Sequence, residues 1–292
     1  MKTKSTSLKK LYLLTIPFAV GLLGTSQARA MQQIDILCTA TEGCGQSSGT
    51  TTDGTIFEAE ANPTQPSTGT GVFKPFVRVQ DSSGTQSGYN TDTGNPDTNF
   101  DTKAGMWTHS VLFGDLGTVD IGGFAYYQFS LDANENGASD SLANQIDLTE
   151  IQIFLGGSEL ATPESYSNNY GYTGMQFDGS AAGNTLAGYA PVWNLDNATN
   201  GDVKVTLQAS ICDTNGQCGS GKGDLNLFIL QSMFQGNPED YFVFYTEYDR
   251  VGSGFEEWRY LAKSVPVPEP GTLALFGLGL SGLILTRRRL RK

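Results

Sequence analysis

The segment Val203-Lys204-Val205-Thr206-Leu207-Gln208-Ala209-Ser210-Ile211 carries the clearest structural pattern of the chain. Its apolar residues alternate with polar ones, which is the period of a β-strand that turns one face to a core and the other to water. Ile151, Ile153 and Leu155 alternate in the same way. We therefore expect both segments to be strands of a sheet that is buried on one side.

Strand-like composition continues through the rest of the chain. Aromatic and β-branched residues concentrate at 124–131, 225–230 and 241–248, and many of the 36 glycines separate such runs, together with Ser, Thr, Asn and Asp. No long helical period occurs between Met31 and Val265. This pattern predicts an all-β fold for residues 31–264, an antiparallel β-sandwich of the jelly-roll or immunoglobulin-like type.

Two stretches of this body have no clear strand pattern. Residues 82–103 are polar apart from Tyr89 and Phe100, and we expect a long exposed loop there. Residues 234–240 are expected to form a single helical turn or a loop.

The first 30 residues have the features of a secretory signal peptide. An apolar run at 11–23 follows a region with four lysines, and Ala28-Arg29-Ala30 supplies the small-x-small site at which such peptides are cut, at Ala28 and Ala30. The apolar run is too short for a membrane-spanning helix. The mature protein is expected to begin near Met31.

The carboxyl end has three parts. Val265-Pro266-Val267-Pro268-Glu269-Pro270 cannot be a helix interior, because proline lacks an amide donor and its predecessor favours extended geometry. Residues 271–286 are uncharged and as a helix would measure about 24 Å, which predicts one transmembrane helix in a locally thinned bilayer. The cations that follow should stay in the cytoplasm by the positive-inside rule. They are Arg287, Arg288, Arg289, Arg291 and Lys292.

These three parts resemble the PEP-CTERM sorting signal of bacterial exosortase substrates. The resemblance rests on Val267-Pro268-Glu269-Pro270, the short apolar run and the Arg cluster, and it covers residues 265–292. It implies a precursor that the secretion machinery exports and the inner membrane anchors. An exosortase then cuts near the motif, and the product reaches the cell surface or the extracellular matrix. An ordinary anchor that is never cut is the alternative.

The charge of the body excludes one class of partner. The signal peptide and the tail contain ten of the 18 Lys and Arg residues, whereas 29 of the 30 acidic residues lie between Met31 and Pro268, which leaves a net charge of −21 there. Such a surface repels nucleic acid and anionic membranes and offers sites to divalent cations. We therefore expect no nucleic-acid partner.

Four cysteines lie in the body, in two similar pairs, Cys38-x5-Cys44-Gly and Cys212-x5-Cys218-Gly. An even number of cysteines in an exported chain predicts disulfides. We expect the local pairs Cys38–Cys44 and Cys212–Cys218. A four-cysteine zinc site is the alternative, although zinc knuckles usually space their thiolates by about two to four residues.

The best candidate for a metal site is Asp132-Ala133-Asn134-Glu135-Asn136-Gly137-Ala138-Ser139-Asp140. It matches the front half of an EF-hand loop, in which oxygens at alternate positions converge on calcium. The expected ligands are Asp132, Asn134, Asn136 and Asp140. The back half departs from the motif, because Ala143 stands at the twelfth position, so Asp147 or Glu150 would have to fold back as a ligand. A hydrophilic turn is the alternative.

Other possible sites are weaker. A second oxygen cluster would combine Asp92, Asp97, Asn99 and Asp101. The segment Gly216 to Gly223 imitates a phosphate-binding loop but has Gly223 where Ser or Thr would hold magnesium. His109, the single histidine, lies in the strand-like run 107–111 without a nucleophile elbow, and 29 acids single out no carboxylate pair for hydrolysis. We expect no catalysis.

Aromatic residues leave a binding role open. Trp193 and Trp258 are expected in the core, whereas four tyrosines in polar sequence could stack on sugars. These are Tyr166, Tyr170, Tyr172 and Tyr189.

Three phrases of the body also resemble uncharacterised extracellular modules of PEP-CTERM proteins, which implies an exported β domain without an assigned activity. They are Phe129-Ser130-Leu131-Asp132 through Ile151-Gln152-Ile153-Phe154, Trp193-Asn194-Leu195-Asp196, and Gly254-Phe255-Glu256-Glu257-Trp258. We expect a structural or adhesive protein with calcium as its cofactor, in contact with extracellular polysaccharide. A carbohydrate-binding module and a secreted hydrolase are the alternatives.

Overall fold

The structure is a computed structural model, and it describes part of the chain. The described residues are 31–37, 48–60, 73–81, 84–90, 92, 101–103, 105–135, 145–156, 176–177, 186–187, 191–209, 223–252 and 254–264. The expected signal peptide, the four cysteines and the sorting segment lie outside these ranges. In the described part no helix is long and apolar enough to cross a membrane.

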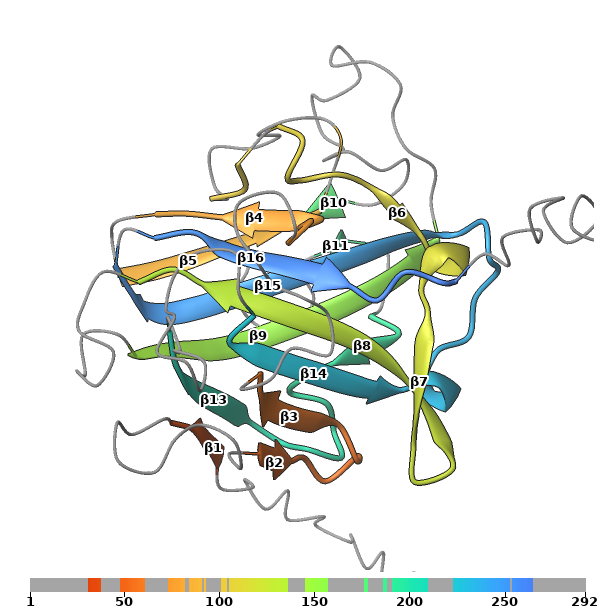
Figure 1. The fold of residues 1–292 in the computed structure, drawn as a ribbon, viewed down its shortest axis with the longest axis horizontal. Helices are drawn as coiled ribbons and strands as arrows, with labels where there is room; N and C mark the ends of the chain where they lie inside the picture. The colour runs from red at the N-terminus through yellow and green to blue at the C-terminus, as the bar shows by residue number, and fades with distance from the viewer. Residues whose placement is uncertain are drawn as a thin grey trace, which may run out of the picture.

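Two seven-stranded sheets make up most of the described body (Figure 1). The first sheet has the order β1 (Gln32–Ile36), β13 (Val203–Gln208), β9 (Gln145–Gly156), β15 (Tyr241–Val251) and β5 (Gly84–Tyr89). Two short strands join it, since β12 (Trp193–Asn194) pairs with β9 and β6 (Val111–Leu112) pairs with β15.

The second sheet has the order β2 (Ser48–Thr50), β3 (Ile56–Ala59), β14 (Leu225–Leu230), β8 (Phe124–Ala133), β16 (Glu256–Tyr260) and β4 (Val77–Val79). Strand β7 (Thr118–Ile121) forms a hairpin with β8. Two 3-10 turns, η1 (Phe113–Asp115) and η4 (Gln231–Met233), close one end of the body, and β10 (Gln176–Phe177) pairs with β11 (Leu186–Ala187) as a separate ribbon.

Aromatic side chains from the two sheets meet in one core. Phe129 of β8 stacks on Phe242 of β15, with ring centroids 5.5 Å apart and planes 7° from parallel. Phe244 of β15 packs on Trp258 of β16 across the same interface, with ring centroids 5.1 Å apart and planes tilted by 55°. These side chains are fully buried, as are Val205, Leu207 and Ala209 of the segment that begins at Val203. The sandwich is therefore held by contacts of β15 in the first sheet with β8 and β16 in the second.

The expected fold class is confirmed as all-β with two packed sheets. The expected strands at 124–131, 225–230 and 241–248 correspond to β8, β14 and β15. One pairing departs from the antiparallel expectation, because β1 lies parallel to β13, whereas the other described ladders are antiparallel. A hairpin fixes the direction of neighbouring strands, and β1 is too distant from β13 in the chain for such a constraint.

Two local expectations were wrong. Residues 84–89, expected in a long loop, form edge strand β5 on β15, and Tyr89 is fully buried. The strand has no hydrophobic alternation, and at Gly88 the side chain of Val79 occupies the space that a side chain of β5 would fill. A Cβ at Gly88 would lie 2.4 Å from Val79. Residues 107–110, expected as a strand, form a turn and a bend before β6 begins at Val111.

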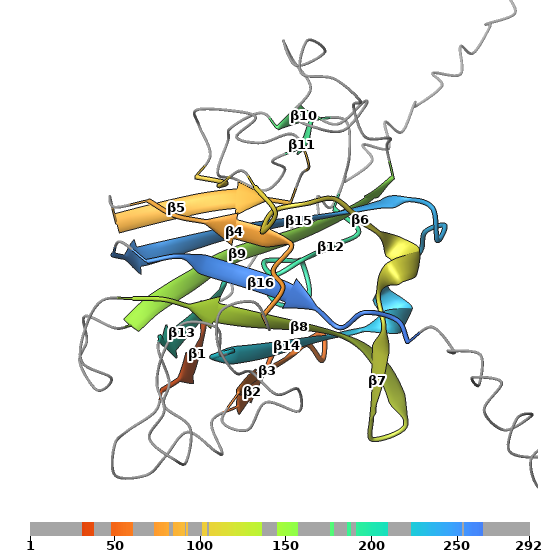
Figure 2. The same cartoon turned by 45° about the horizontal axis from the view of Figure 1, so that its top comes forward.

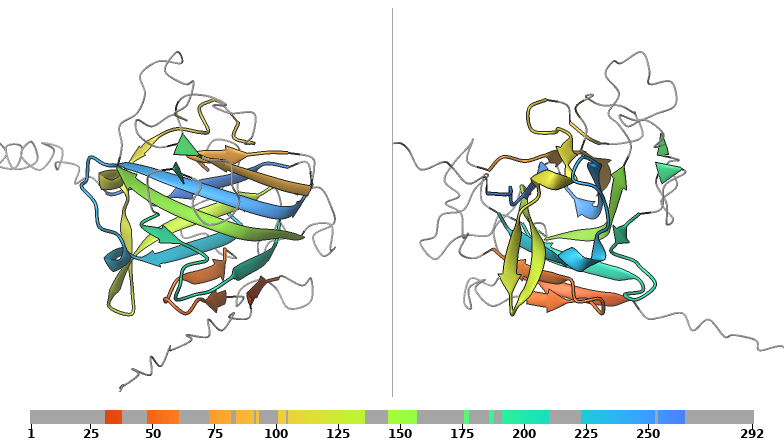
Figure 3. Two further views of the ribbon diagram at one scale, coloured as in Figure 1. Left: turned by 180° about the vertical axis from the view of Figure 1, so that it is seen from behind. Right: turned by 90° about the vertical axis from the view of Figure 1, so that its right-hand side faces the viewer.

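The long strands β8, β9, β14 and β15 run along the long axis of the body (Figure 3). We call the end that carries η1, η4 and Lys263 the exit end, because the described chain leaves the body there (Figure 2). The other end, where β8 finishes at Ala133 and β16 begins at Glu256, we call the carboxylate end. Strand β8 spans from one to the other, which separates them by about 30 Å for ten residues.

The stacked contact predicts a steep dependence of stability on one position. Phe129→Ala should lower the free energy of unfolding by about 3–5 kcal/mol, because it leaves a cavity between the sheets. Phe124→Ala on the same strand, where the ring is 64% exposed, should change it by less than about 0.5 kcal/mol. Equilibrium urea unfolding compares the two variants, and equal losses would show that β8 does not pack as described.

Candidate functional site

The carboxylate end brings together two turns that are far apart in the sequence. After β8, the backbone N–H and the side-chain amide of Asn134 both donate to the carbonyl of Phe255. The N–H of Gly252 donates to Oε1 of Glu135 at 2.7 Å. A Cβ at Gly254 would lie 1.2 Å from the carbonyl oxygen of Asn134, so only glycine permits this approach. The segment before β16 is thereby held against the residues that follow β8.

Glu256 is the most unusual residue of this end. It lies opposite Ala133 in the ladder, which directs it toward the interior with Trp258, and its side chain is fully buried. Among the described residues no N–H or hydroxyl group donates to either of its carboxylate oxygens, and its polar neighbour is the carboxyl group of Glu135. Burial, followed by the neighbouring carboxyl of Glu135 and the charge of Asp132, raises the pKa of Glu256 well above its usual value.

A buried carboxylate without a donor is stable only if a proton or a cation neutralises it. The nearest polar partner, Glu135, is itself an acid, so a hydrogen bond between the two carboxyls requires a proton. Tyr248 is also fully buried, and its hydroxyl oxygen accepts a hydrogen bond from the indole N–H of Trp258. We call Asp132, Glu135 and Glu256 the carboxylate cluster.

The carboxylate cluster overlaps the expected calcium ligands only in part. Asp132 and Asn134 lie there, but Asp132 is a strand residue of β8 and not the first position of a loop. Asn136 and Asp140 lie outside the described residues. Within the described ranges no group of three or more His, Cys, Asp or Glu side chains is arranged to hold a metal ion. Glu256 was missed because no local motif marks it; it reaches the cluster only through the pairing of β16 with β8.

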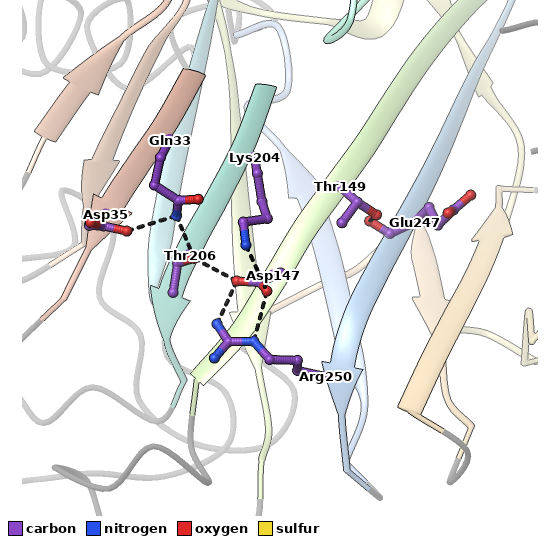
Figure 4. A network of polar contacts seen from close by, with 8 residues as sticks. All are labelled: Gln33, Asp35, Asp147, Thr149, Lys204, Thr206, Glu247 and Arg250. Atoms are coloured by element: carbon purple, nitrogen blue, oxygen red, sulfur yellow. Dashed lines mark hydrogen bonds and ion pairs between the residues drawn. The ribbon is translucent and has the colours of Figure 1, made fainter. Parts of the chain in front are cut away.

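A polar network lies on the outer face of the first sheet (Figure 4). Asp147 accepts hydrogen bonds from both Nε and Nη2 of Arg250, and from the hydroxyl of Thr206. Lys204 lies 3.4 Å from the same carboxylate. Burial alone raises the pKa of Asp147, but the hydrogen bonds from Arg250 and Thr206 outweigh it and lower the pKa. Arg250 and Lys204 both contact the carboxylate of Asp147, which indicates a structural tie between strands.

Arg250 has φ of +61°, the left-handed region that a side chain of its size rarely adopts. It sits at the register shift between Asp249 and Val251, where β15 bulges against β5. The paired hydrogen bonds to Asp147 offset the strain of this conformation. The ion pair thus fixes the bulge at the end of β15.

A second group of acids on the first sheet is less completely paired. Glu150 lies opposite Glu247 in the ladder between β9 and β15, and Asp196 follows β12 nearby. Burial raises the pKa of Glu150 to about 8, and the charges of Asp196 and Glu247 add to the rise. Burial raises the pKa of Asp196 to about 6, against a hydrogen bond from the N–H of Val203. Tyr245 donates its hydroxyl to Glu247.

Acid–base hydrolysis of a glycosidic bond requires two carboxyl groups that can flank the bond. Glu150 and Glu247 lie opposite each other in the ladder, and among the described residues they are the carboxylate pair that we single out for chemistry. Sequence analysis could not identify it, because the pairing depends on the register of β9 with β15.

A groove of about 500 Å³ opens at the exit end, and we call it the exit groove. Its walls are largely aromatic: Tyr127 contacts Phe234 edge-on at 5.2 Å and Phe113 at 5.6 Å. The lining residues are Phe113, Gly123, Phe124, Ala125, Tyr127, Leu230, Gln231, Ser232 and Phe234. The tyrosines expected to bind sugars lie outside the described residues, whereas Trp193 and Trp258 are buried as expected.

The remaining expected sites are dispersed. His109 is half-buried, which lowers its pKa. Asp92 accepts hydrogen bonds from Ser110, and Asp101 accepts one from the N–H of Ser87. Asp97 and Asn99 lie outside the described residues.

Gly223, the residue that breaks the phosphate-loop pattern, has a different structural role. A Cβ there would lie 1.7 Å from Oε2 of Glu60, so the glycine makes room for that carboxylate. Glu60 in turn pairs with Arg259 at 2.8 Å.

The raised pKa of Glu150 predicts a pH-dependent stability. Ionising this carboxyl in the folded protein is unfavourable, so stability present below pH 4.5 is lost as the pH rises toward 8. Glu150→Gln should leave the free energy of unfolding unchanged at pH 4 and raise it by about 2–4 kcal/mol at pH 8. Urea unfolding at both pH values, with exposed Glu58→Gln as control, tests this. A gain of the same size at pH 4 would contradict the burial of an ionisable Glu150.

Comparison with known proteins identifies the carboxyl end of the chain. The model of the PEP-CTERM protein-sorting motif matches residues 266–289. No curated protein and no solved structure matches the chain. The motif implies a membrane-anchored precursor that an exosortase processes and that reaches the cell surface. The chain is therefore a protein with a PEP-CTERM sorting domain.

Proposed function

We propose that the body is a non-catalytic structural or adhesive domain of the cell surface or extracellular matrix, and that calcium stabilises its carboxylate end. The single observation that carries the calcium site is Glu256, a fully buried carboxylate without a hydrogen-bond donor among the described residues. Glu135 and Asp132 add negative charge beside it. At neutral pH this concentration of charge requires either a retained proton or a cation.

Calcium fits the chemistry of these groups. It is a hard cation that prefers six to eight oxygen ligands, from carboxylates, amide carbonyls and water. Glu256 begins β16, Glu135 follows β8, and the amide of Asn134 lies on the same turn. Asp132 lies opposite Glu257 in the ladder, on the other face of the sheet from Glu256, so it would contribute charge to the site and not a ligand. Further ligands would come from Asn136 and Asp140, the other members of the motif. The net charge of −21 on the body favours any divalent cation.

The position of the carboxylate cluster supports an adhesive role. The chain leaves the body at Ser264 on its way to the membrane anchor, and the carboxylate cluster lies at the opposite end, about 30 Å away. This end is therefore the one farther from the point at which the sorting segment is attached. A cation held there could bridge the acidic body to an anionic polysaccharide outside the cell.

A secreted hydrolase is the second candidate, and the opposed pair Glu150 and Glu247 favours it. Glu150, whose pKa is about 8, would act as the acid, and Glu247 lies opposite it in the ladder as the second carboxyl. In that case Glu150→Gln would abolish glycan hydrolysis while it leaves the calcium response of the protein unchanged.

Thermal unfolding with calcium and with chelator tests the proposed calcium site. Calcium at 100 times its dissociation constant should stabilise the body by about 2.7 kcal/mol, which raises Tm by about 5–10 °C for a domain of this size. Glu256→Gln should lose most of this shift. Glu257→Gln, the adjacent acid that lies opposite Arg78 in the ladder, should keep it.

The same variant has a second signature that does not depend on calcium. In chelator the raised pKa of Glu256 costs stability as the pH rises above 4.5, so Glu256→Gln should be more stable than the parent at pH 7 and equal to it at pH 4. An equal calcium shift in the parent and in Glu256→Gln would refute the site. So would a parent protein that does not respond to calcium.

A further inference from the structure

The described chain leaves the body beside the exit groove. The N–H of Gly117 donates to the carbonyl of Leu261 at 2.7 Å, and the N–H of Lys263 donates to the carbonyl of Asp115 at 2.8 Å. Residues 261–263 therefore run antiparallel to 115–117, with the bridge between Leu116 and Ala262 at the centre. The described chain ends at Ser264, next to the turn that contains Phe113, which is a wall of the groove.

Residues 261–263 also run beside strand β8, which supplies other walls of the exit groove. The N–H of Leu261 donates to the carbonyl of Gln128, the neighbour of groove residue Tyr127. Figure 2 shows η1, η4 and the last described residues of the chain at the same end of the sandwich. The groove and the last described residues before the sorting segment therefore lie at the same end of the sandwich.

The chemistry of the groove suits an extended peptide that combines apolar side chains with free carbonyl groups. Its surface is nearly as polar as apolar: aromatic rings come from Phe113, Phe124, Tyr127 and Phe234, and side-chain polar groups from Gln231 and Ser232. Phe124, on the hairpin of β7 and β8, is 64% exposed. Aromatic-lined grooves of this kind bind proline-rich segments in the polyproline II conformation, because proline rings pack on aromatic faces and leave few amide donors unsatisfied.

We propose that the segment Val265-Pro266-Val267-Pro268-Glu269-Pro270 of the same chain docks in the exit groove. Proline at every second position favours the extended conformation that such grooves accept. Six residues at about 3.1 Å each reach about 19 Å from Ser264, enough to lie along a groove that begins next to Phe113. Attachment at Ser264 gives the segment a millimolar effective concentration, so even weak docking is populated.

Docking gives the body a part in its own processing. The Pro268-Glu269-Pro270 motif would rest against the folded protein, and a protease would have to lift it from the groove to reach it. The state of the body, and not only the flexibility of a linker, would then set access to the motif. This arrangement is independent of calcium at the opposite end of the sandwich.

Photo-crosslinking in the full-length precursor, purified in detergent micelles with chelator present, tests the docking. Phe124 is replaced by p-benzoylphenylalanine, an aromatic residue of similar shape at an exposed position, and the products are mapped by mass spectrometry. We expect intramolecular crosslinks to residues 265–270. Replacing Pro266, Pro268 and Pro270 by Ser, outside the folded body, should lower their yield at least about fivefold.

The control and the other outcomes are equally specific. The same photoreactive residue at Met106, which is 75% exposed and does not line the groove, should give no crosslink to 265–270. Adducts with detergent alone would assign the groove to the membrane surface, and products of dimer mass would assign it to a second copy of the chain. Either result, or a yield that the Ser substitutions leave unchanged, would overturn the proposal.

Discussion

The contact between Phe129 of β8 and Phe242 of β15 determines how everything else is placed. It joins interior strands of the two sheets, and Phe244 and Trp258 extend the same aromatic layer. Beyond this aromatic layer the two ends of β8 carry polar or open structures. The exit groove lies at one end of β8 and the carboxylate cluster at the other, so the two ends differ in chemistry while they share one rigid strand.

Buried acids distinguish this sandwich from a purely apolar one. Asp147 is paired with Arg250 and Thr206, and Glu60 with Arg259, so each of these carboxylates has a donor. Burial still raises the pKa of Glu60, which shows how costly even a paired charge is in this core. Glu256 has no such partner among the described residues, and this difference makes the carboxylate end the place where a cation would change stability most.

Strands β8, β13, β14 and β15 were predictable because their residues alternate in polarity or are rich in aromatic side chains. Strand β5 has no such local pattern, and its residues Gln86 and Ser87 owe their strand geometry to pairing with β15. The direction of β1 follows from contacts with β13, more than 160 residues away in the chain. The carboxylate cluster shows the same limit: Asp132 belongs to a local motif, whereas Glu256 reaches the cluster through the ladder between β8 and β16. Local patterns predict strands; the partners of a strand depend on the whole sheet.

All of the proposed roles require that the body work outside the cytoplasm after it is separated from its anchor. Mass spectrometry of the protein released by cells that make the full-length chain measures both new ends directly. The expected product begins near Met31 and ends close to Pro268-Glu269-Pro270, without residues 271–292. Intact chain in the cytoplasm, from Met1 to Lys292, would contradict export and processing.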